Sequence, residues 1–362
     1  MDWQGSLYGT TSFGGESPTC QPFGCGTVFK IDPHGNETVV HSFTGSPDGE
    51  DTVYGSLIRD AWGNLYGTTD QGGAFGNGSV FKVDRAGNET VLYSFTGLAD
   101  GGSPVGGLTM DARGNLYGTA SAGGYYSPIY GENSCCGVVF KLDQAGNETV
   151  LHAFEITEGS YPESTPILDG KGNLYGTTFG SVFKLDLKTL TLTTLYSGAA
   201  TSTLILDEAG NIYGTSSDGG EFNAPTCQPY GCGTVFKVDR AGNQTVLYNF
   251  TGGEDGGWPI AGVIRDAAGN LYGTTYSGGT SANGCAQFCG VVFKLDPAGN
   301  ETVLYSFTEA ADGGNPTAPL IQDAAGDLYG TTTFGGDFTG TCGGVIGCGT
   351  VFKLTRSPQL PW

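Results

Sequence analysis

Two short motifs recur along this chain in a fixed order, and each occurs seven times. The first, Leu-Tyr-Gly-Thr or Ile-Tyr-Gly-Thr, begins at Leu7, Leu65, Leu116, Leu174, Ile212, Leu271 and Leu328. The second, Val-Phe-Lys, follows each copy of the first and begins at Val28, Val80, Val139, Val182, Val235, Val292 and Val351. Successive copies of the first lie between 38 and 59 residues apart, a spacing typical of propeller blades rather than of helical solenoids.

Each repeat predicts four short strands. In the sixth repeat these strands cover residues 262–266, 270–275, 291–296 and 301–307. The fourth alternates two sets of side chains with a period of two, as a strand does. No segment of the chain keeps helical periodicity for three turns. The repeat is therefore a β unit.

The turns within a repeat follow one pattern. Asp-x-x-Gly-Asn joins the first strand to the second at 266–270 and the third to the fourth at 296–300. The Asp side chain can accept hydrogen bonds from amide groups of the turn, and the Gly can adopt a positive φ. Asn-Glu-Thr triplets, formally glycosylation sites, fall in the same hairpin and are better explained by turn chemistry. Each repeat is thus predicted to be a four-stranded antiparallel meander.

These units predict an all-β fold, a seven-bladed β-propeller of four-stranded antiparallel blades. Seven sheets arranged around an axis bury one another's faces, and closing the ring protects their edges. We expect one propeller domain over residues 1–362. Its last residues, 355–362, form a C-terminal tail. The expected blades cover approximately 1–44, 54–96, 105–155, 164–197, 201–251, 260–308 and 317–354.

The first and last blades are incomplete. The first and fourth strands each have six complete copies, so the chain supplies 26 strands where seven full blades need 28. One interpretation is that a segment upstream of Met1 supplies the missing strands and carries a signal peptide. Another is that the open edge of the last blade accepts a strand from a neighbouring molecule, because an unpaired edge is a template for pairing.

The repeat unit resembles the GloVer repeats of bacterial surface proteins that carry various anchors. The residues that carry this resemblance are Asp-Ala-x-Gly-Asn-Leu-Tyr-Gly-Thr-Thr, Gly-Thr-Val-Phe-Lys and Gly-Asn-Glu-Thr-Val-Leu-Tyr-Ser-Phe-Thr-Gly. It spans nearly the whole chain, and the fourth repeat departs most from it. The unit is more distantly similar to NHL-type propeller blades. The resemblance implies the propeller fold and a surface location, and it implies no particular chemistry.

The charge of the chain narrows the range of partners. With 36 acidic and 15 basic residues, the formal net charge is −21, which repels phosphate backbones and anionic lipid. We therefore expect no nucleic-acid partner, and no apolar stretch is long enough for membrane insertion. The first five residues do not resemble a signal peptide. We expect a secreted, extracellular or cell-surface protein.

The cysteines form close pairs just ahead of the Val-Phe-Lys motifs, in the loops between the second and third strands. Disulfides that staple these Gly-rich loops explain the even count and imply an oxidising compartment. A zinc site would need two pairs from different blades, and the three histidines lie elsewhere. Sequence leaves open whether the adjacent pair forms a strained ring or stays reduced. The predicted disulfide residues are Cys20, Cys25, Cys135, Cys136, Cys227, Cys232, Cys285, Cys289, Cys342 and Cys348.

The candidate ligand-binding residues lie on the face formed by these loops and by the connections between blades, one of which holds Trp258. Exposed aromatic rings on rigid loops can stack on sugar rings or anchor a protein partner. The alternative is that these rings pack over their own loops. The candidates are Phe23, Tyr125, Tyr126, Tyr130, Tyr230, Trp258 and Phe288.

Metal and catalytic chemistry have weaker support. We expect no cofactor; Asp-Gly pairs in the blade connections (Asp48, Asp100, Asp255 and Asp312) could hold calcium, but Asp-Gly is also a common turn. The Asp that ends the first strand recurs from blade to blade, which favours a structural role. No nucleophile triad, phosphate loop or histidine-rich metal set is present, so no catalytic residue is assigned.

Three functions follow from this pattern. The first is a non-catalytic extracellular or cell-surface propeller with a structural or adhesive role, self-assembling through strand exchange at its open blade edge. The second is a glycan-binding module that uses the loop aromatics. The third, a secreted carbohydrate-active enzyme with a lone carboxylate pair, has the least support. The expected partners are other copies of the chain, or a surface glycan or protein.

Overall fold

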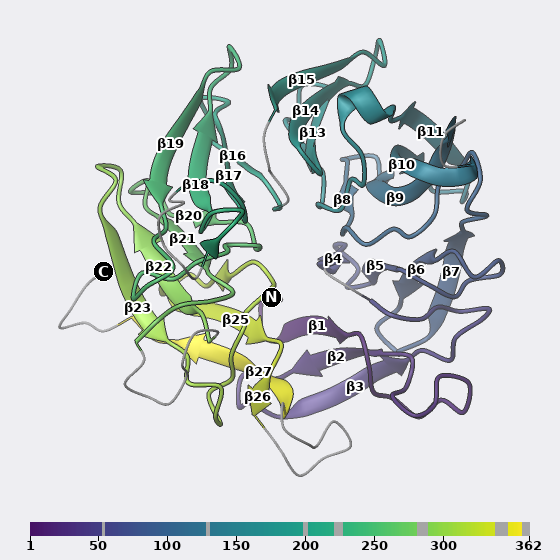
Figure 1. Cartoon of the computed structure of the whole chain (residues 1–362). Coiled ribbons are helices and arrows are strands. Elements are labelled where there is room, and N and C mark those ends of the chain that lie inside the picture. The colour runs from purple at the N-terminus through teal and green to yellow at the C-terminus, as the bar shows by residue number, and fades with distance from the viewer. Residues whose placement is uncertain are drawn as a thin grey trace. The chain divides into compact units, whose positions relative to one another are not determined.

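The computed structural model describes residues 1–52, 55–127, 131–197, 202–220, 227–280, 289–336 and 347–356, and within these it leaves the side chains of 125–127 and 131–135 undescribed. The chain divides into two compact units, Met1–Thr194 and Leu195–Trp362. Over the described residues there are seven sheets, and the fold is a seven-bladed β-propeller of mostly four-stranded antiparallel blades. The predicted fold class is confirmed (Figure 1).

The first unit begins with a three-stranded blade of β1 (Leu7–Thr11), β2 (Thr27–Ile31) and β3 (Glu37–Ser42). The second blade contains β4 (Ile58–Arg59), β5 (Leu65–Thr69), β6 (Ser79–Val83) and β7 (Glu89–Ser94). The third contains β8 (Thr109–Met110), β9 (Leu116–Ser127), β10 (Gly131–Leu142) and β11 (Glu148–Ala153). The fourth contains β12 (Ile167–Leu168), β13 (Asn173–Thr178), β14 (Ser181–Asp186) and β15 (Leu192–Ser197), whose last residues belong to the second unit.

The second unit holds the remaining three blades. The fifth contains β16 (Ile205–Leu206), β17 (Ile212–Ser216), β18 (Thr234–Val238) and β19 (Gln244–Asn249). The sixth contains β20 (Ile264–Arg265), β21 (Leu271–Thr274), β22 (Val291–Leu295) and β23 (Glu301–Ser306). The seventh contains β24 (Ile321–Gln322), β25 (Leu328–Thr332), β26 (Gly335–Gly336) and β27 (Gly347–Leu354). A short 3₁₀ turn, η1 (Ile156–Glu158), follows β11.

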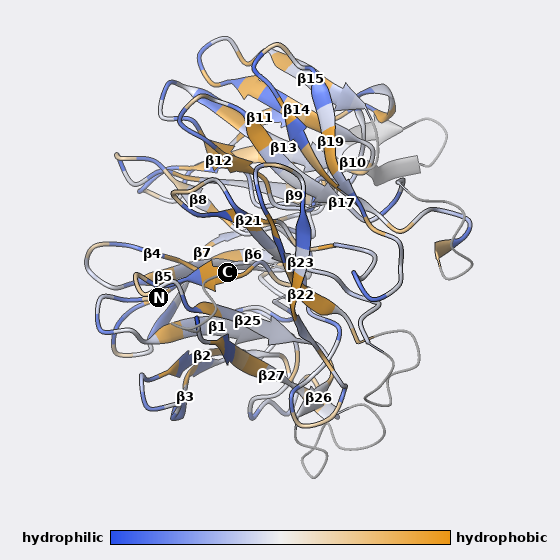
Figure 2. Cartoon of the chain, turned by 90° about the vertical axis from the view of Figure 1, so that its left-hand side faces the viewer, coloured by the Kyte–Doolittle hydropathy of each residue, from blue (hydrophilic) through white to orange (hydrophobic). Residues whose placement is uncertain are grey.

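The blades are meanders, as predicted, with one addition. Within the described ranges the first strand occurs in six blades and the fourth in six, so the first blade lacks a first strand and the seventh lacks a fourth. The added element is β26, two glycines that pair in parallel with the beginning of β27. Hydrophobic residues lie mainly on the strands, whereas the hairpin turns are largely hydrophilic (Figure 2).

The Asp-x-x-Gly-Asn turn is built by its own side chains. In the sixth blade, the backbone N–H of Asn270 donates to Asp266 Oδ1 at 2.8 Å, and Asn270 Nδ2 donates to Asp266 Oδ2 at 2.7 Å. The hydroxyl of Tyr272 donates to the same Oδ2 at 3.1 Å. Gly269 takes a φ of 89°, which costs glycine little. These charged-acceptor bonds lower the pKa of Asp266, although burial opposes them as the largest single influence.

Neighbouring blades pack through pairs of phenylalanine rings. The Phe that follows a fourth strand lies edge-on against the Phe of the next blade's third strand, as Phe307 does against Phe352 with ring centroids 5.1 Å apart. The same contact joins Phe43 to Phe81, Phe95 to Phe140, Phe154 to Phe183, and Phe250 to Phe293. Edge-to-face packing of this kind stabilises the core beyond the area it buries.

The third blade corrects one expectation. Tyr125 and Tyr126 belong to strand β9 rather than to a loop, and Cys135 and Cys136 belong to strand β10. Tyr125 pairs with Cys135, and Gly124 pairs with Cys136. The hairpin therefore continues beyond the blade, because the ladder resumes after a register shift and keeps the backbone groups of both segments paired.

Over the described residues no helix is long and apolar enough to cross a membrane.

Candidate functional site: an aromatic pocket beside a disulfide loop

Two loops of matching sequence, Cys-Gln-Pro-aromatic-Gly-Cys, fold in the same way in the two units. Cys20 bonds to Cys25 and Cys227 bonds to Cys232, with Cα–Cα distances of 5.2 and 4.8 Å. Each loop folds back on itself, since Gly24 N–H donates to the carbonyl of Cys20 at 2.8 Å. Gly231 N–H donates in the same way to the carbonyl of the first cysteine of its own loop, at 2.7 Å.

The aromatic residue of each loop projects outward. Phe23 is 66% exposed and Tyr230 is 67% exposed. Their carbonyls accept hydrogen bonds from Gly14 and Gly219, both at 2.7 Å, so the backbone beneath each ring is fixed. A Cβ on Gly231 would meet the carbonyl oxygen of Gly219 at 2.2 Å, which explains the glycine after the aromatic residue. The rings are thus presented by rigid loops.

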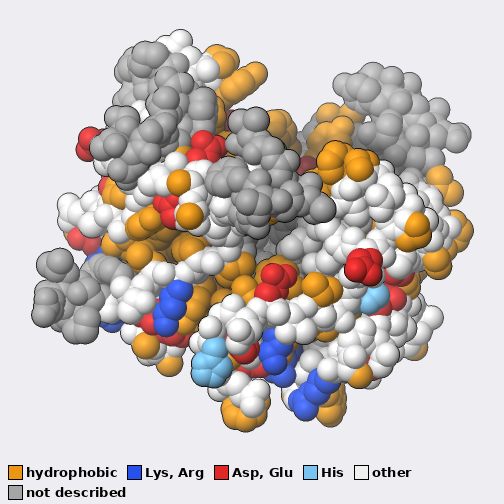
Figure 3. All heavy atoms as spheres, turned by 90° about the horizontal axis from the view of Figure 1, so that it is seen from below, with side chains coloured by type: hydrophobic (Ala, Val, Ile, Leu, Met, Phe, Trp, Pro, Cys, Tyr) orange, Lys and Arg blue, Asp and Glu red, His pale blue; other side chains and the backbone are white. Residues whose placement is uncertain are grey.

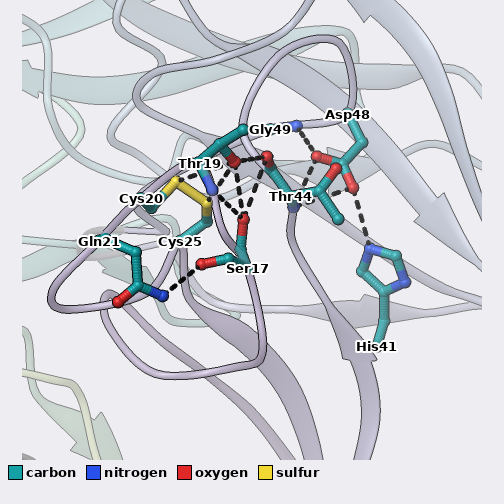
Figure 4. The surroundings of a disulfide bond; sticks show 9 residues. All are labelled: Ser17, Thr19, Cys20, Gln21, Cys25, His41, Thr44, Asp48 and Gly49. Carbon is teal, nitrogen blue, oxygen red and sulfur yellow. Dashed lines mark hydrogen bonds and ion pairs between the residues drawn. A yellow bond between two sulfur atoms is a disulfide. The ribbon is translucent and has the colours of Figure 1, made fainter.

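Figure 4 shows the interactions that surround the first of these disulfides. Asp48 accepts hydrogen bonds from the N–H groups of Thr44 at 3.0 Å and Gly49 at 2.6 Å. His41 Nε2 lies 3.5 Å from Asp48 Oδ2. These contacts lower the pKa of Asp48 against the effect of its burial, which acts in the opposite direction. This Asp-Gly carboxylate therefore orders the blade connection.

The other three Asp-Gly carboxylates have the same role. Asp255 accepts from Thr251 N–H at 2.8 Å, from Thr251 Oγ1 at 2.5 Å and from the Tyr248 hydroxyl at 3.1 Å. Asp100 and Asp312 accept from the equivalent Thr and Tyr groups. These four carboxylates, the sequence candidates for calcium, thus all accept hydrogen bonds within the blade connections. In the described part of the chain, no three His, Cys, Asp or Glu side chains are grouped as a metal site.

A pocket of about 290 Å³ lies beside the second disulfide loop, within the second unit. Tyr230 and Trp258, both predicted as ligand-binding residues, line it together. The remaining lining residues are Ser217, Asp218, Ile260 and Tyr276. Three aromatic rings, one carboxylate and three hydroxyl groups, those of Ser217, Tyr230 and Tyr276, therefore surround the pocket. This composition suits a ligand with apolar faces and hydroxyl edges.

Trp258 is held firmly on the wall of this pocket. It is half-buried, with a φ of 55°. Its N–H donates to the carbonyl of Cys232 at 2.8 Å, and its indole Nε1 donates to the carbonyl of Gly231 at 3.2 Å. The carbonyl of Trp258 in turn accepts from Tyr276 N–H at 3.0 Å. Hydrogen bonds thus join the disulfide loop, Trp258 and Tyr276 into one rigid cluster.

The other sequence candidates have different outcomes. Phe23 occupies the equivalent loop in the first unit. Tyr125 and Tyr126 lie in β9 with undescribed side chains, and Tyr130 and Phe288 lie outside the described residues. Cys136, Cys289 and Cys348 are disulfide-bonded. Cys285 and Cys342 lie outside the described residues, and nothing is said of the Cys135 side chain.

Sequence reasoning missed Tyr276, Ile260, Ser217 and Asp218. Tyr276 was detectable, because it follows Leu-Tyr-Gly-Thr-Thr at a place where the other repeats carry Ser, Asp, Phe or Thr. Among the described lining residues, Asp218 is the only carboxylate.

Known structures that align with TM-scores above 0.5 share this fold. An oligogalacturonate lyase in complex with manganese aligns with a TM-score of 0.55 at 12% identity, over 93% of this chain and 86% of that one. A puromycin-hydrolysing peptidase of Mycobacterium tuberculosis aligns with a TM-score of 0.55 at 13% identity, over 91% of this chain and 49% of that one. TolB from Acinetobacter baumannii aligns with a TM-score of 0.39 at 14% identity, over 65% of this chain and 52% of that one.

At these identities the likeness concerns the fold alone, and this chain spans about half the length of TolB and of the peptidase. No curated protein sequence matches the chain significantly. The family model described as the Gloeobacter/Verrucomicrobia repeat matches residues 2–180, 130–286 and 178–359. These overlapping matches cover nearly the entire chain.

Proposed function

This chain belongs to the Gloeobacter/Verrucomicrobia repeat family, and from that premise we propose that it is a non-catalytic, adhesive propeller of the cell exterior that binds glycans. The binding site is the Tyr230–Trp258 pocket, defined by Ser217, Asp218, Tyr230, Trp258, Ile260 and Tyr276. The observation that carries the proposal is the convergence of exposed Tyr230 and tethered Trp258 on one pocket.

The shape and chemistry of the pocket favour a sugar. Aromatic rings pack against the apolar faces of pyranose rings, and a carboxylate and a hydroxyl can bond the ring's hydroxyl groups. A pocket of about 290 Å³ is at the lower end for small-molecule sites, so it suits one sugar unit of a longer chain. The loop is already fixed by its disulfide, which reduces the entropy lost on binding.

The exterior location is supported by the disulfides. Disulfides persist in oxidising compartments and are rare in the cytosol, and this chain has two fully described ones in surface loops. A net charge of −21 favours neutral or cationic ligands over anionic polymers. On the face drawn in Figure 3, Lys and Arg side chains are few and scattered, with no continuous basic patch.

Replacing one ring tests the proposal. We expect Tyr230→Ala to weaken binding to neutral polysaccharides about tenfold, or about 1.4 kcal/mol, because a stacking surface is lost. Binding is measured by affinity electrophoresis and calorimetry against soluble β-glucans, xylans and mannans. Phe23→Ala is the matched control, since Phe23 has the same loop and almost the same exposure but does not line this pocket.

Phe23→Ala should leave the affinity within twofold of the unmodified protein. Equal losses in the two variants would show that general surface stickiness, not the pocket, holds the glycan. Failure of every neutral polysaccharide to bind would remove the glycan function. Release of reducing sugar from any of them would replace the binding role with an enzymatic one.

A further inference from the structure

The third strand of the seventh blade, β27, has one uncovered edge. Residues Thr350 to Leu354 pair with β25 on one side. On the other side, β26 pairs only with Gly347 and Gly349 (Figure 1). Among the described residues, nothing pairs with the rest of that edge. A row of unpaired backbone N–H and C=O groups is a template for an added strand.

The side chains of this strand are more exposed than their counterparts in the other blades. Val351 is 38% exposed, whereas its counterparts in the other six blades are fully buried. Those counterparts are Val28, Val80, Val139, Val182, Val235 and Val292, each 0% exposed. Phe352 and Leu354 are half-buried, although Phe293 and Leu295 in the sixth blade are 0% and 1% exposed. The sequence of β27 is thus that of an internal strand at an edge position.

A cavity of about 250 Å³ lies along the uncovered edge, within the second unit. From the seventh blade, the cavity is lined by Thr350, Val351, Phe352, Lys353 and Leu354 of β27. It is also lined by Val292, Tyr305 and Phe307 of the sixth blade and by Ala311 and Asp312 of the connection that follows. The cavity therefore lies beside β23, the fourth strand of the sixth blade. A fourth strand of the seventh blade would occupy this place.

The sixth blade shows what such a strand looks like. There the third strand pairs Val291 with Ser306, Val292 with Tyr305, Phe293 with Val303, Lys294 with Thr302 and Leu295 with Glu301, with a register shift after Val292. The same register and shift recur in the first, second, third and fifth blades. The third-strand sequence Thr-Val-Phe-Lys-Leu of β27 fits this register residue for residue.

We infer that the free edge of β27 binds an extended polypeptide segment with the chain's own fourth-strand pattern, Glu-Thr-Val-x-Tyr-Ser-Phe, as an antiparallel strand. Its Glu faces Leu354, its Thr faces Lys353 and its Val faces Phe352. After the bulge, its Tyr faces Val351 and its Ser faces Thr350. Main-chain hydrogen bonds supply affinity, and the alternating side chains supply selectivity.

The occupant is an additional segment rather than a strand exchanged with a second copy. Each of the six fourth strands in the described chain already pairs with a third strand of its own blade. Donating one to a neighbour would uncover an equivalent edge, so exchange gives no net pairing in an open assembly. The strand-exchange polymer considered from the sequence is therefore one outcome of the test below.

The experiment uses a fluorescent peptide that copies residues 300–308, Asn-Glu-Thr-Val-Leu-Tyr-Ser-Phe-Thr, and the intact protein. We expect saturable binding by anisotropy and slower amide hydrogen exchange at Thr350–Leu354. A peptide of the same composition in scrambled order should bind at least tenfold more weakly. Val351→Lys should weaken binding of the native-order peptide at least tenfold, because charges on a strand edge oppose pairing.

Val246→Lys is the matched control, because Val246 is 44% exposed but lies on a strand already paired with β18; it should change the affinity less than twofold. Equal binding of both peptides, or protection away from β27, would overturn the inference. So would a protein that self-associates by light scattering and excludes the peptide. If Val351→Lys fails to fold, the scrambled peptide and the exchange pattern still decide the outcome.

Discussion

At the scale of single residues, the third position of Leu-Tyr-Gly-Thr shows why the repeat tolerates so little variation. A Cβ on the glycines at this position would lie 2.5–2.8 Å from the nearest side-chain atom. In each blade that site is crowded by the Phe ring of the neighbouring third strand. The seven glycines are Gly9, Gly67, Gly118, Gly176, Gly214, Gly273 and Gly330. The motif therefore imposes a packing constraint in addition to forming a strand.

Gly273→Ala tests this constraint. The new methyl group would lie 2.7 Å from Phe293 Cζ, and overpacking a core costs about 1–3 kcal/mol. We expect that loss in the free energy of unfolding, measured with urea. Adding Phe293→Leu makes room, so the double variant should lose less than the sum of the two single variants. Strict additivity would show that the ring is not the cause.

At the scale of structural elements, the disulfide loops combine a covalent closure with a presented ring. Each closes a short loop, for which the chain-entropy model gives about 2 kcal/mol. The pocket adds a role for only one of them, because Trp258 hydrogen-bonds the backbone of the Cys227–Cys232 loop. The same local fold is therefore structural in the first unit and, we propose, functional in the second.

Replacing both cysteines of a loop with serine separates these roles. We expect each double variant, at Cys20 and Cys25 or at Cys227 and Cys232, to lose about 2 kcal/mol of stability. Only the second should also weaken polysaccharide binding severalfold, because Tyr230 and Trp258 lose their fixed support. Thermal unfolding and affinity electrophoresis on both variants provide the comparison. Equal effects on binding would remove the link between loop and pocket.

At the scale of the whole molecule, three half-buried glutamates set a pH dependence. Burial, aided by a neighbouring Asp, raises the pKa of Glu89, Glu148 and Glu301 to about 7, and nearby His41 partly opposes the shift at Glu89. Their Oε1 atoms are buried without a hydrogen-bond partner in the described structure. Because the folded-state pKa exceeds the ordinary value of 4.5, the folded protein holds these protons more tightly than the unfolded chain.

The stability contributed by these protons is complete below about pH 4.5 and is lost as the pH rises through 7. Allowing for partial solvent screening, we expect about 1 kcal/mol per site. The hairpin aspartates have lowered pKa values, as at Asp266, so their contribution is lost below pH 4. Stability should peak near pH 5. Glu89→Gln, Glu148→Gln and Glu301→Gln combined should stabilise the protein at pH 8 but not at pH 5, as judged by calorimetry.

An unchanged melting temperature at pH 8 would mean that water or ions solvate these carboxylates. A gain at pH 5 as large as the gain at pH 8 would indicate better packing of the amide rather than relief of charge. If relief of charge is the cause, the gain in stability must grow with pH as these three carboxyl groups lose their protons. Single substitutions would then show whether the three sites contribute independently, as expected for groups on different blades.

The amino-acid sequence by itself determined the fold class, the blade count, the strand order and the hairpin chemistry. Each depends on residues close together in the chain: period-two strands, Asp-x-x-Gly-Asn turns, and a repeat that copies the same local solution seven times. It also placed Tyr230 and Trp258 among the candidate ligand residues. Local patterns are sufficient there because the strands of one blade pair with each other within about 50 residues of sequence.

Only the tertiary structure decided which residues share a site. Tyr276 joins Tyr230 and Trp258 across two blades, and Tyr125 and Tyr126 belong to an extended hairpin instead of a loop. The exposure of Val351 also required the structure, because its sequence is that of six buried counterparts. Burial depends on what packs against a strand from elsewhere in the molecule, and a local motif is the same whether that neighbour is present or absent.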